Sequence, residues 1–556
     1  MKKLYLLGFV FFSLLSLGIS AEEIPRFIRK NPYQVISLPK TVSVSNGIIT
    51  AQFAPDSMGR MTSLNVDNKE ILQRFERKSL VGNPLFAPKD CNVFGFRELL
   101  WRTPMATLDL PVTLVEKKDN SIIFSTNSYG NTPLKLYRKA TLRANSSIVD
   151  FEVTFSNLAA KSYTYQLWLN LLPLQPYLPI IPLYDGIKSK FNLGNNFFQP
   201  ATNWNAAFVP KANSVIAIAW NKKDMRYNGE IYVHGAQDFT TLEAVLGSRT
   251  LKKDQRLTHN YKILVFKGIK QINALANETA ISVTPKDKEF ELTFCPASPT
   301  NLVKGKLYFS NFTLDINIPP LKTNQLYKIV VPQEPNYLII NNQAMVEFFS
   351  SNPPKKQIKI VAFGDSITEG LTKVKLEDNW LLKLGLKLGG NYKLYNAGVG
   401  GNSAREAMKR YQKDVLDKNP DVILLEFGGN NHDPSPLRKH RRVSDKEFLN
   451  LLNKFKAKLP RHCKVVMVTF PPIINEKHLY FKQVPGGKVD EELHSQREIV
   501  RKFAQENNYP LLDLYKLILP NKEELISSDG IHLSAKGHTF FAQEMEKVLR
   551  KYKIVK

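Results

Sequence analysis

Two short polar motifs, far apart in the chain, carry the residue types of a serine hydrolase. The first reads GDSIT over residues 364–368 and directly follows an apolar run, and the second reads DGIH over residues 529–532. A serine hydroxyl becomes an effective nucleophile only when a base removes its proton as it attacks. We predict Ser366 as the nucleophile, His532 as its base, and Asp529 as the residue that orients this histidine and stabilises its cation.

Two segments rich in glycine and asparagine follow other apolar runs and offer donors for an oxyanion. They read NAGVGGNS over residues 396–403 and GGNN over residues 428–431. A tetrahedral intermediate of acyl transfer needs N–H groups aimed at its negative oxygen. We predict an oxyanion hole formed by the main-chain N–H groups of Ser366 and Gly401 and by the side-chain amide of Asn430.

The elements that must position these motifs lie after residue 356, where apolar strand-like runs alternate with helical patterns. The strand-like runs cover residues 358–363, 394–397, 422–427, 465–470 and 511–514, and the last helix is expected over 534–552. Ser444, with Glu447 three residues later, has the pattern of a helix capping box. This alternation predicts a parallel sheet covered on both faces. The four motifs follow predicted strand ends, the edge where such sheets bind ligands.

With these four motifs, the sequence resembles the SGNH hydrolase superfamily, also called GDSL-type esterases. The resemblance covers residues 357–552, with blocks at 364–368, 396–403, 428–431 and 529–532. One position departs from the family pattern, because Asn431 stands where the family has an aspartate. The resemblance implies an α/β flavodoxin-like domain, no metal and no cofactor, and ester hydrolysis through an acyl-enzyme intermediate.

Upstream of this region the sequence is typical of all-β domains. Short runs with period-two alternation, such as residues 149–153 and 163–169, recur between turn residues. We divide the chain into a signal peptide (1–21), a large β-sandwich (22–275), a small β-sandwich (276–350), a linker (351–356) and the hydrolase domain (357–556). The large sandwich resembles the β-supersandwich of galactose-mutarotase-like domains, without a matching catalytic motif.

Five aromatic residues are candidates for stacking on sugars. They are Trp168, Trp204, Trp220 and Tyr227 in the large sandwich and Trp380 in the hydrolase domain. Flat rings present apolar faces to the C–H groups of a pyranose, but for any one of these rings a place in the core is the favoured interpretation. His432, His440 and His538 are interpreted as structural or surface residues.

The net charge and the N-terminal segment indicate what kind of partner the protein binds and where it is located. The net charge of +27 favours anionic partners, and the basic start followed by an apolar run over residues 4–17 is typical of a secretory signal. We therefore expect export to the periplasm or the cell exterior, no nucleic-acid partner, and no stable insertion in a membrane. Three cysteines in 556 residues do not make a disulfide scaffold.

These observations together predict an exported, multidomain serine esterase. We expect it to remove acyl groups, in the first place acetyl, from a polysaccharide or oligosaccharide, with an acidic polymer fitting the basic charge. A lipase, lysophospholipase or thioesterase with the same triad is one alternative. A non-catalytic carbohydrate-binding protein is the other, and the sequence makes no prediction of oligomeric state.

Overall fold

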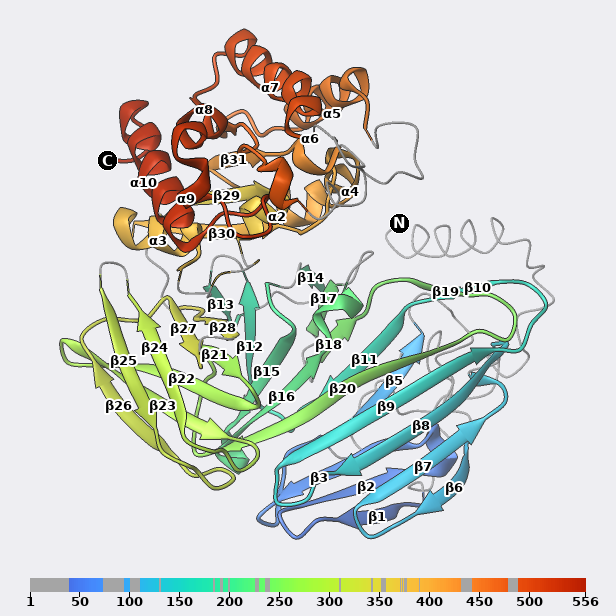
Figure 1. The fold of residues 1–556 in the computed structure, drawn as a ribbon. Helices are drawn as coiled ribbons and strands as arrows, with labels where there is room; N and C mark the ends of the chain where they lie inside the picture. Colours follow the sequence, from blue (N-terminus) through green and yellow to red (C-terminus); the bar gives the residue numbers. More distant parts are fainter. Residues whose placement is uncertain are drawn as a thin grey trace, which may run out of the picture.

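The protein consists of an antiparallel β region followed by an α/β region (Figure 1). The computed structural model describes residues 40–73, 95–100, 111–129, 132–183, 186–190, 194–198, 201–225, 230–235, 241–309, 312–341, 344–351, 357–370, 372, 374, 378–389, 391–431, 443–478 and 489–556. The predicted signal peptide, most of the predicted linker, and the residues Tyr227, His432 and His440 lie outside these ranges. No helix in the described ranges is long and apolar enough to cross a membrane.

The large sandwich is formed by two sheets, each with nine described strands. In the first sheet the order is β1 (Val42–Ser45), β2 (Ile49–Ala54), β3 (Arg60–Val66), β5 (Gly95–Leu100), β11 (Leu167–Leu172), β18 (Leu242–Val245), β17 (Glu230–Gly235) and β14 (Gly194–Phe198), with β4 (Lys69–Glu70) beside β3. In the second it is β13 (Gly186–Lys188), β12 (Leu178–Leu183), β15 (Trp204–Val209), β16 (Ser214–Trp220), β20 (Arg256–Lys267), β9 (Ile148–Asn157), β8 (Leu134–Leu142), β7 (Ser121–Thr126) and β6 (Thr113–Lys117). Alternate residues of these strands fill one apolar core between the two sheets.

Two further β units complete the antiparallel region. A two-stranded ribbon joins β10 (Tyr163–Tyr165) to β19 (Arg249–Leu251). The small sandwich packs the sheet β21 (Ala274–Ala276), β22 (Thr279–Lys286), β23 (Glu289–Pro296) and β26 (Tyr327–Val331) against β25 (Thr313–Ile318), β24 (Val303–Tyr308), β27 (Tyr337–Ile340) and β28 (Ala344–Glu347). Both sandwiches agree with the all-β character that the alternating sequence predicts.

The α/β region is built on a parallel sheet of five described strands. Their order is β30 (Tyr392–Gly398), β29 (Ile358–Gly364), β31 (Val422–Glu426), β32 (Lys464–Val468) and β33 (Leu511–Leu512). The helices are α2 (Ser366–Glu369), α3 (Trp380–Leu388), α4 (Ala404–Asp414), α5 (Asp445–Ala457), α6 (Val489–Glu492), α7 (His494–Glu506), α8 (Leu514–Ile518), α9 (Lys522–Leu525) and α10 (Ala535–Lys551). The sequence-based prediction of a parallel sheet with helices is confirmed.

Both faces of this sheet are buried, which explains its continuous apolar strands. On β29, Ile360 and Ala362 belong to the core beneath α3 and α10, whereas Val361 and Phe363 belong to the core beneath α4, α5 and α7. Successive side chains of a strand point to opposite faces, so a strand covered on both sides must be apolar throughout. On the central strand β31 the polar residue, Glu426, is then confined to the strand end, the edge at which the candidate site lies.

The α/β region contacts both sandwiches through β30 and α4. The hydroxyl of Tyr337 on β27 donates to the carbonyl of Leu394 on β30 at 3.2 Å, and Lys393 forms an ion pair with Glu347 on β28 at 2.6 Å. The Nζ of Lys413 on α4 donates to a carbonyl of the large sandwich. In Figure 1 the α/β region lies above the sandwiches, with α3 and β30 on the side that faces them.

Candidate active site

Three predicted site residues meet at the carboxyl edge of the parallel sheet. His532 Nε2 lies 2.9 Å from Ser366 Oγ, and His532 Nδ1 lies 2.8 Å from Asp529 Oδ2. The serine follows β29, whereas the other two residues lie in the loop before α10, and His532 is 166 positions away from the serine along the chain. The contacts form one chain of hydrogen-bonding groups from carboxylate to imidazole to hydroxyl. This is the geometry that nucleophilic serine chemistry requires.

The turn that presents Ser366 is tight because of its glycine and its cap. A Cβ atom on Gly364 would lie 1.9 Å from Thr368 Oγ1, so only glycine allows β29 to approach α2 this closely. Asp365 is the N-cap of α2, and its Oδ1 accepts from the N–H of Ile367 at 2.9 Å. Ser366 is therefore the first residue of a short helix, with its main-chain N–H directed outward at the helix start.

The loop that carries Asp529 fixes the orientation of this carboxylate. Its Oδ1 accepts from the N–H groups of Ile531 and His532, both at 3.0 Å, and from Ser527 Oγ at 2.8 Å. Burial by itself raises the pKa of Asp529, but the hydrogen bonds from His532, the loop N–H groups and Ser527 outweigh it and hold the pKa well below its usual range. Asp529 is thus an anion that accepts the Nδ1–H of the imidazole.

The predicted oxyanion donors border Ser366 on two sides. Gly401, with φ of 74°, lies in an exposed turn after β30, and a Cβ atom on Gly400 would lie 3.7 Å from the Cβ of Ser366. Glu369 Oε2 holds this turn by accepting from the N–H of Gly400 at 3.0 Å. Asn430 Nδ2 donates to Asp365 Oδ2 at 3.2 Å, so its amide also lies at the nucleophile turn.

Arg410 on α4 ties these loops together and was not predicted from the sequence. Its guanidinium donates to the carbonyls of Gly364 at 2.8 Å and Ala397 at 2.7 Å, and to Asn402 Oδ1 at 2.7 Å. It also pairs with Asp414 at 3.0 Å. The planar fork of arginine suits several acceptors held in fixed directions. The sequence does not single out this residue, because an arginine in a predicted helix is expected to be an ordinary exposed cation.

Asn431, the departure from the family pattern, has a clear structural role. It is fully buried, its Oδ1 accepts from the N–H of Ala404 at 3.0 Å, and its Nδ2 donates to Gln496 Oε1 at 2.7 Å. The amide group of Gln496 in turn donates to Asp445 at 2.8 Å. Asn431 therefore links the loop after β31 to the start of α4 and to α7.

The structure corrects most of the predicted sugar-stacking aromatic residues. Trp204 and Trp220 are each 3% exposed and Trp380 is 1% exposed, which leaves no ring face for a sugar. Trp380 stacks on Phe541 with ring centroids 4.1 Å apart and donates from Nε1 to the carbonyl of Thr368. These three residues are core residues, because their strands and helix are covered on the sides they face. Trp168 is half-buried and donates to the buried Glu243, and Tyr227 lies outside the described residues.

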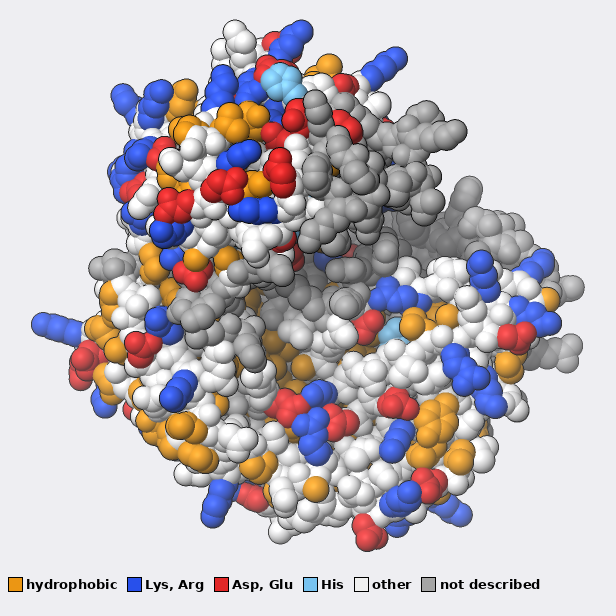
Figure 2. Space-filling model, in the orientation of Figure 1, with side chains coloured by type: hydrophobic (Ala, Val, Ile, Leu, Met, Phe, Trp, Pro, Cys, Tyr) orange, Lys and Arg blue, Asp and Glu red, His pale blue; other side chains and the backbone are white. Residues whose placement is uncertain are grey.

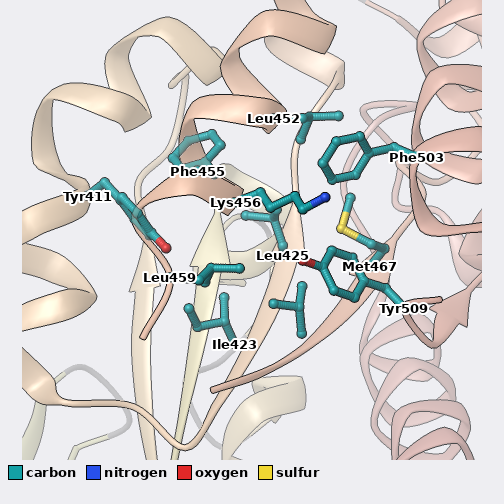
Figure 3. A pocket seen from close by; sticks show the side chains of 11 residues that line it. Tyr411, Ile423, Leu425, Leu452, Phe455, Lys456, Leu459, Met467, Phe503 and Tyr509 are labelled. Carbon is teal, nitrogen blue, oxygen red and sulfur yellow. The ribbon is translucent and has the colours of Figure 1, made fainter. Parts of the chain in front are cut away.

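An apolar cavity of the α/β region lies away from this site (Figure 3). Its lining comes from β31, β32, α4, α5, α7 and the segments that follow α5 and α7, namely Tyr411, Ile423, Leu425, Leu452, Phe455, Lys456, Leu459, Val465, Met467, Phe503 and Tyr509. It lies within the core that covers one face of the sheet, whereas the candidate site lies at the strand ends. We interpret it as a packing gap.

The α/β region is similar to several known proteins. The model of the GDSL-like lipase/acylhydrolase family matches residues 362–540. An uncharacterised lipoprotein of Bacillus subtilis (strain 168) is 31% identical over 205 residues, which cover 32% of this chain and 84% of that protein. A solved acetyl xylan esterase is 29% identical, and the match covers 34% of this chain and 100% of that chain, with a TM-score of 0.30.

A further solved structure corresponds to the region before the α/β domain. It is described as an aldose 1-epimerase of Escherichia coli K12 and is 13% identical, with a match over 41% of this chain and 98% of that chain and a TM-score of 0.31. The segment matched by the family model contains Ser366, Gly401, Asn430, Asp529 and His532. The chain belongs to the GDSL-like lipase/acylhydrolase family.

Proposed function

We propose that this protein is an exported serine esterase that removes acetyl groups from a carbohydrate polymer. The observation that carries the esterase part is the hydrogen-bonded chain from Asp529 through His532 to Ser366, with separations of 2.8 Å and 2.9 Å. The family assignment as an acylhydrolase agrees with it. The carbohydrate substrate, the acetyl group and the export go beyond this observation. They rest on the surroundings of Ser366, the net charge and the predicted signal peptide.

The reaction would proceed in two steps through an acyl-enzyme. His532 Nε2 accepts the proton of Ser366 as Oγ attacks the ester carbonyl, and the same nitrogen then protonates the departing alcohol. Asp529 holds the Nδ1–H and stabilises the imidazolium that forms. Water repeats the sequence on the acyl-serine and regenerates the free hydroxyl.

The tetrahedral intermediate would be stabilised by three N–H donors at the edge of the sheet. We assign this role to the main-chain N–H groups of Ser366 and Gly401 and to Asn430 Nδ2. The amide of Asn430 carries two hydrogens, and the one that binds Asp365 fixes the direction of the other. Preorganised donors of this kind cost no reorganisation as the negative charge develops.

The surroundings of Ser366 support a polar substrate over a long apolar chain. In the part of the chain that the structure describes, Asn396, Gly400 and Gly401 are exposed beside it, and Asn402 and Glu369 are half-buried. Amide and carboxylate groups lose hydrogen bonds to water when a lipid tail covers them, whereas sugar hydroxyls replace those bonds. We therefore favour an acetylated glycan over a lipid, with the sandwiches as the parts that hold the polymer.

Net charge and the predicted signal peptide support the location and class of polymer. The net charge of +27 favours an acidic glycan, and the apolar start of the chain favours export. Figure 2 shows Lys and Arg distributed over both regions on one face rather than gathered in one patch. Binding of this kind should weaken as salt rises, because exposed charges are screened.

The test compares hydrolysis of p-nitrophenyl acetate and a p-nitrophenyl ester with a longer acyl chain, by the wild type and Ser366→Ala. We expect activity that depends on Ser366 and falls with chain length, followed by release of acetate from acetylated polysaccharides. Activity that increases with chain length would favour a lipolytic enzyme instead. Equal activity of Ser366→Ala would overturn the esterase assignment, and Ser147→Ala, in the large sandwich, controls for loss of a buried hydroxyl.

A further inference from the structure

Two carboxyl groups lie buried against each other beneath Ser366. Asp365 follows β29 and is 0% exposed, and Glu426 ends β31 and is 1% exposed. These strands are hydrogen-bonded neighbours, with Phe363 opposite Leu425 in the register, so the next positions along both strands meet at the same edge. The mechanism proposed above does not use Glu426.

The hydrogen bonds around the pair give Asp365 a donor on each oxygen but leave Glu426 Oε1 without one among the described residues. Asp365 accepts from Ile367 N at 2.9 Å through Oδ1 and from Asn430 Nδ2 at 3.2 Å through Oδ2. Glu426 Oε2 accepts from Thr368 Oγ1 at 3.0 Å, and Oε1 has no donor among the described residues. The two buried carboxyl groups also interact directly with each other, and the main-chain N–H of Asp365 is directed toward Glu426. A carboxylate only accepts, so one of the two groups must carry a proton.

We propose that Glu426 is a neutral carboxylic acid that donates a hydrogen bond to Asp365, and that this shared proton positions Ser366 and Asn430. Glu426 is then a positioning residue, which acts through Asp365 rather than on the substrate. The positioning of Asn430 as an oxyanion donor rests on the proposed esterase function. The protonation of Glu426 rests on the buried pair alone.

The charges around the pair agree with one proton and one negative charge. Burial raises the pKa of Glu426 well above its usual range, and the neighbouring Asp365 raises it further. Burial also raises the pKa of Asp365, to about 6, against the hydrogen bonds of Ile367 and Asn430 and the charge of His532. Arg410 on α4 is a nearby cation that interacts electrostatically with Asp365 and with Glu369. Asp365 is therefore the carboxylate and Glu426 the acid.

Loss of the proton from Glu426 would displace both the helix of the nucleophile and Asn430. Two adjacent buried carboxylates repel each other strongly, since neither is solvated. Asp365 caps the helix of the nucleophile through one oxygen and holds Asn430 through the other, so its displacement moves both groups. A displacement of about 1 Å at a reacting group costs roughly 10²-fold in rate. The positioning is present while Glu426 is protonated and is lost as the pH rises through its raised pKa.

The first experiment detects the proton without use of activity. We would compare infrared spectra of the wild type and Glu426→Gln at pH 8, in the range of the carbonyl stretch of a protonated carboxylic acid. We expect a band in the wild type that Glu426→Gln lacks. The control, Glu447→Gln, removes a carboxylate whose pKa is lowered by its hydrogen bond to Arg405, and should not change this band. Identical spectra of the wild type and Glu426→Gln would overturn the proposal.

The second experiment separates positioning from simple packing. Glutamine at position 426 can donate to Asp365 and accept from Thr368, whereas leucine can do neither. We expect Glu426→Leu to lose roughly 10- to 100-fold in kcat with little change in KM, and Glu426→Gln to recover most of it and to keep its kcat at alkaline pH where the wild type declines. Equal losses in both variants, or equal alkaline declines in the wild type and Glu426→Gln, would contradict the role. An inactive wild type would refute the proposed function and leave the infrared result standing.

Discussion

Asn430 donates one amide hydrogen to Asp365, and in the proposed mechanism the other binds the oxyanion. We expect Asn430→Ala to lower kcat by roughly 10²–10³ with little change in KM, because the donor acts on the charge of the transition state. Steady-state kinetics on p-nitrophenyl acetate measures this. Asn453→Ala is the matched control, since Asn453 is exposed on α5 and donates to the carbonyl of Leu449 in its own helix. A tenfold increase in KM at unchanged kcat would contradict the role.

His259 in the large sandwich titrates differently in the folded and unfolded chain. It is 1% exposed, its Nε2 lies 2.9 Å from the hydroxyl of Tyr165, and burial lowers its pKa from 6.5 to about 4. Between these values the unfolded chain binds the proton and the folded chain does not, so stability falls as the pH drops from 6.5 toward 4.

We therefore expect His259→Gln to lose less free energy of unfolding than the wild type between pH 6.5 and 4.5. The difference should be about 2–3 kcal/mol, at about 1.4 kcal/mol for each unit of pKa shift. Urea unfolding at both pH values measures it, and contributions of other groups cancel in the comparison. His494→Gln, which removes an exposed histidine on α7, should behave as the wild type. Parallel losses in the wild type and His259→Gln would refute the contribution of His259.

At the scale of elements, α2 lies so close to β30 that the strand end must lack a side chain. A Cβ atom on Gly398 would lie 2.1 Å from the N atom of Glu369, whereas one on Gly385, within α3, would meet nothing closer than 3.8 Å. We expect Gly398→Ala to displace α2 and to lower kcat at least tenfold. Gly385→Ala should instead raise the free energy of unfolding by about 0.5–1 kcal/mol.

Kinetics and urea unfolding of the two glycine variants check both expectations. The pair is matched, because each change adds one methyl group to the same domain. Full activity of Gly398→Ala would show that the contact between α2 and β30 does not position the nucleophile.

Helices and strands could be predicted from the sequence where apolar and polar residues follow a regular pattern. The five predicted strands of the parallel sheet are present, although the last is only Leu511–Leu512, since Asp513 caps α8 directly after it. The single strand expected over 163–169 is interrupted at Gln166, and its halves β10 and β11 join different sheets. Period-two alternation marks a strand but not the sheet that it joins.

The candidate site shows the same limit at individual residues. Ser366, Asp529 and His532 were predictable because each lies in a short motif whose chemistry is local. The role of Glu426 could not be predicted, since this residue ends an apolar run and its role depends on its contact with Asp365 on the neighbouring strand. Trp204 and Trp220 stayed candidates for sugar stacking because alternation does not tell which face of a strand another layer covers.

At the scale of the whole molecule, a small set of polar contacts couples the α/β region to the small sandwich. We expect the double variant Tyr337→Phe, Lys393→Ala to separate the thermal unfolding of the two regions, because it removes a hydrogen bond and an ion pair between them. Differential scanning calorimetry measures this. Lys387→Ala removes an ion pair within the α/β region and should leave the shape of the transition unchanged. An unchanged shape in the double variant would show that other contacts couple the regions.

Asn431 and Gln496 have a consequence for the evolution of related sequences. The pair works because the asparagine offers a donor to an oxygen of the glutamine, whose own amide group donates to Asp445 and to the carbonyl of Val443. An aspartate at position 431 would instead place an acceptor against an acceptor in a fully buried space. The two positions should therefore covary: relatives with aspartate at the first should carry a donor, such as arginine or lysine, at the second. An alignment in which the two positions change independently would refute this coupling.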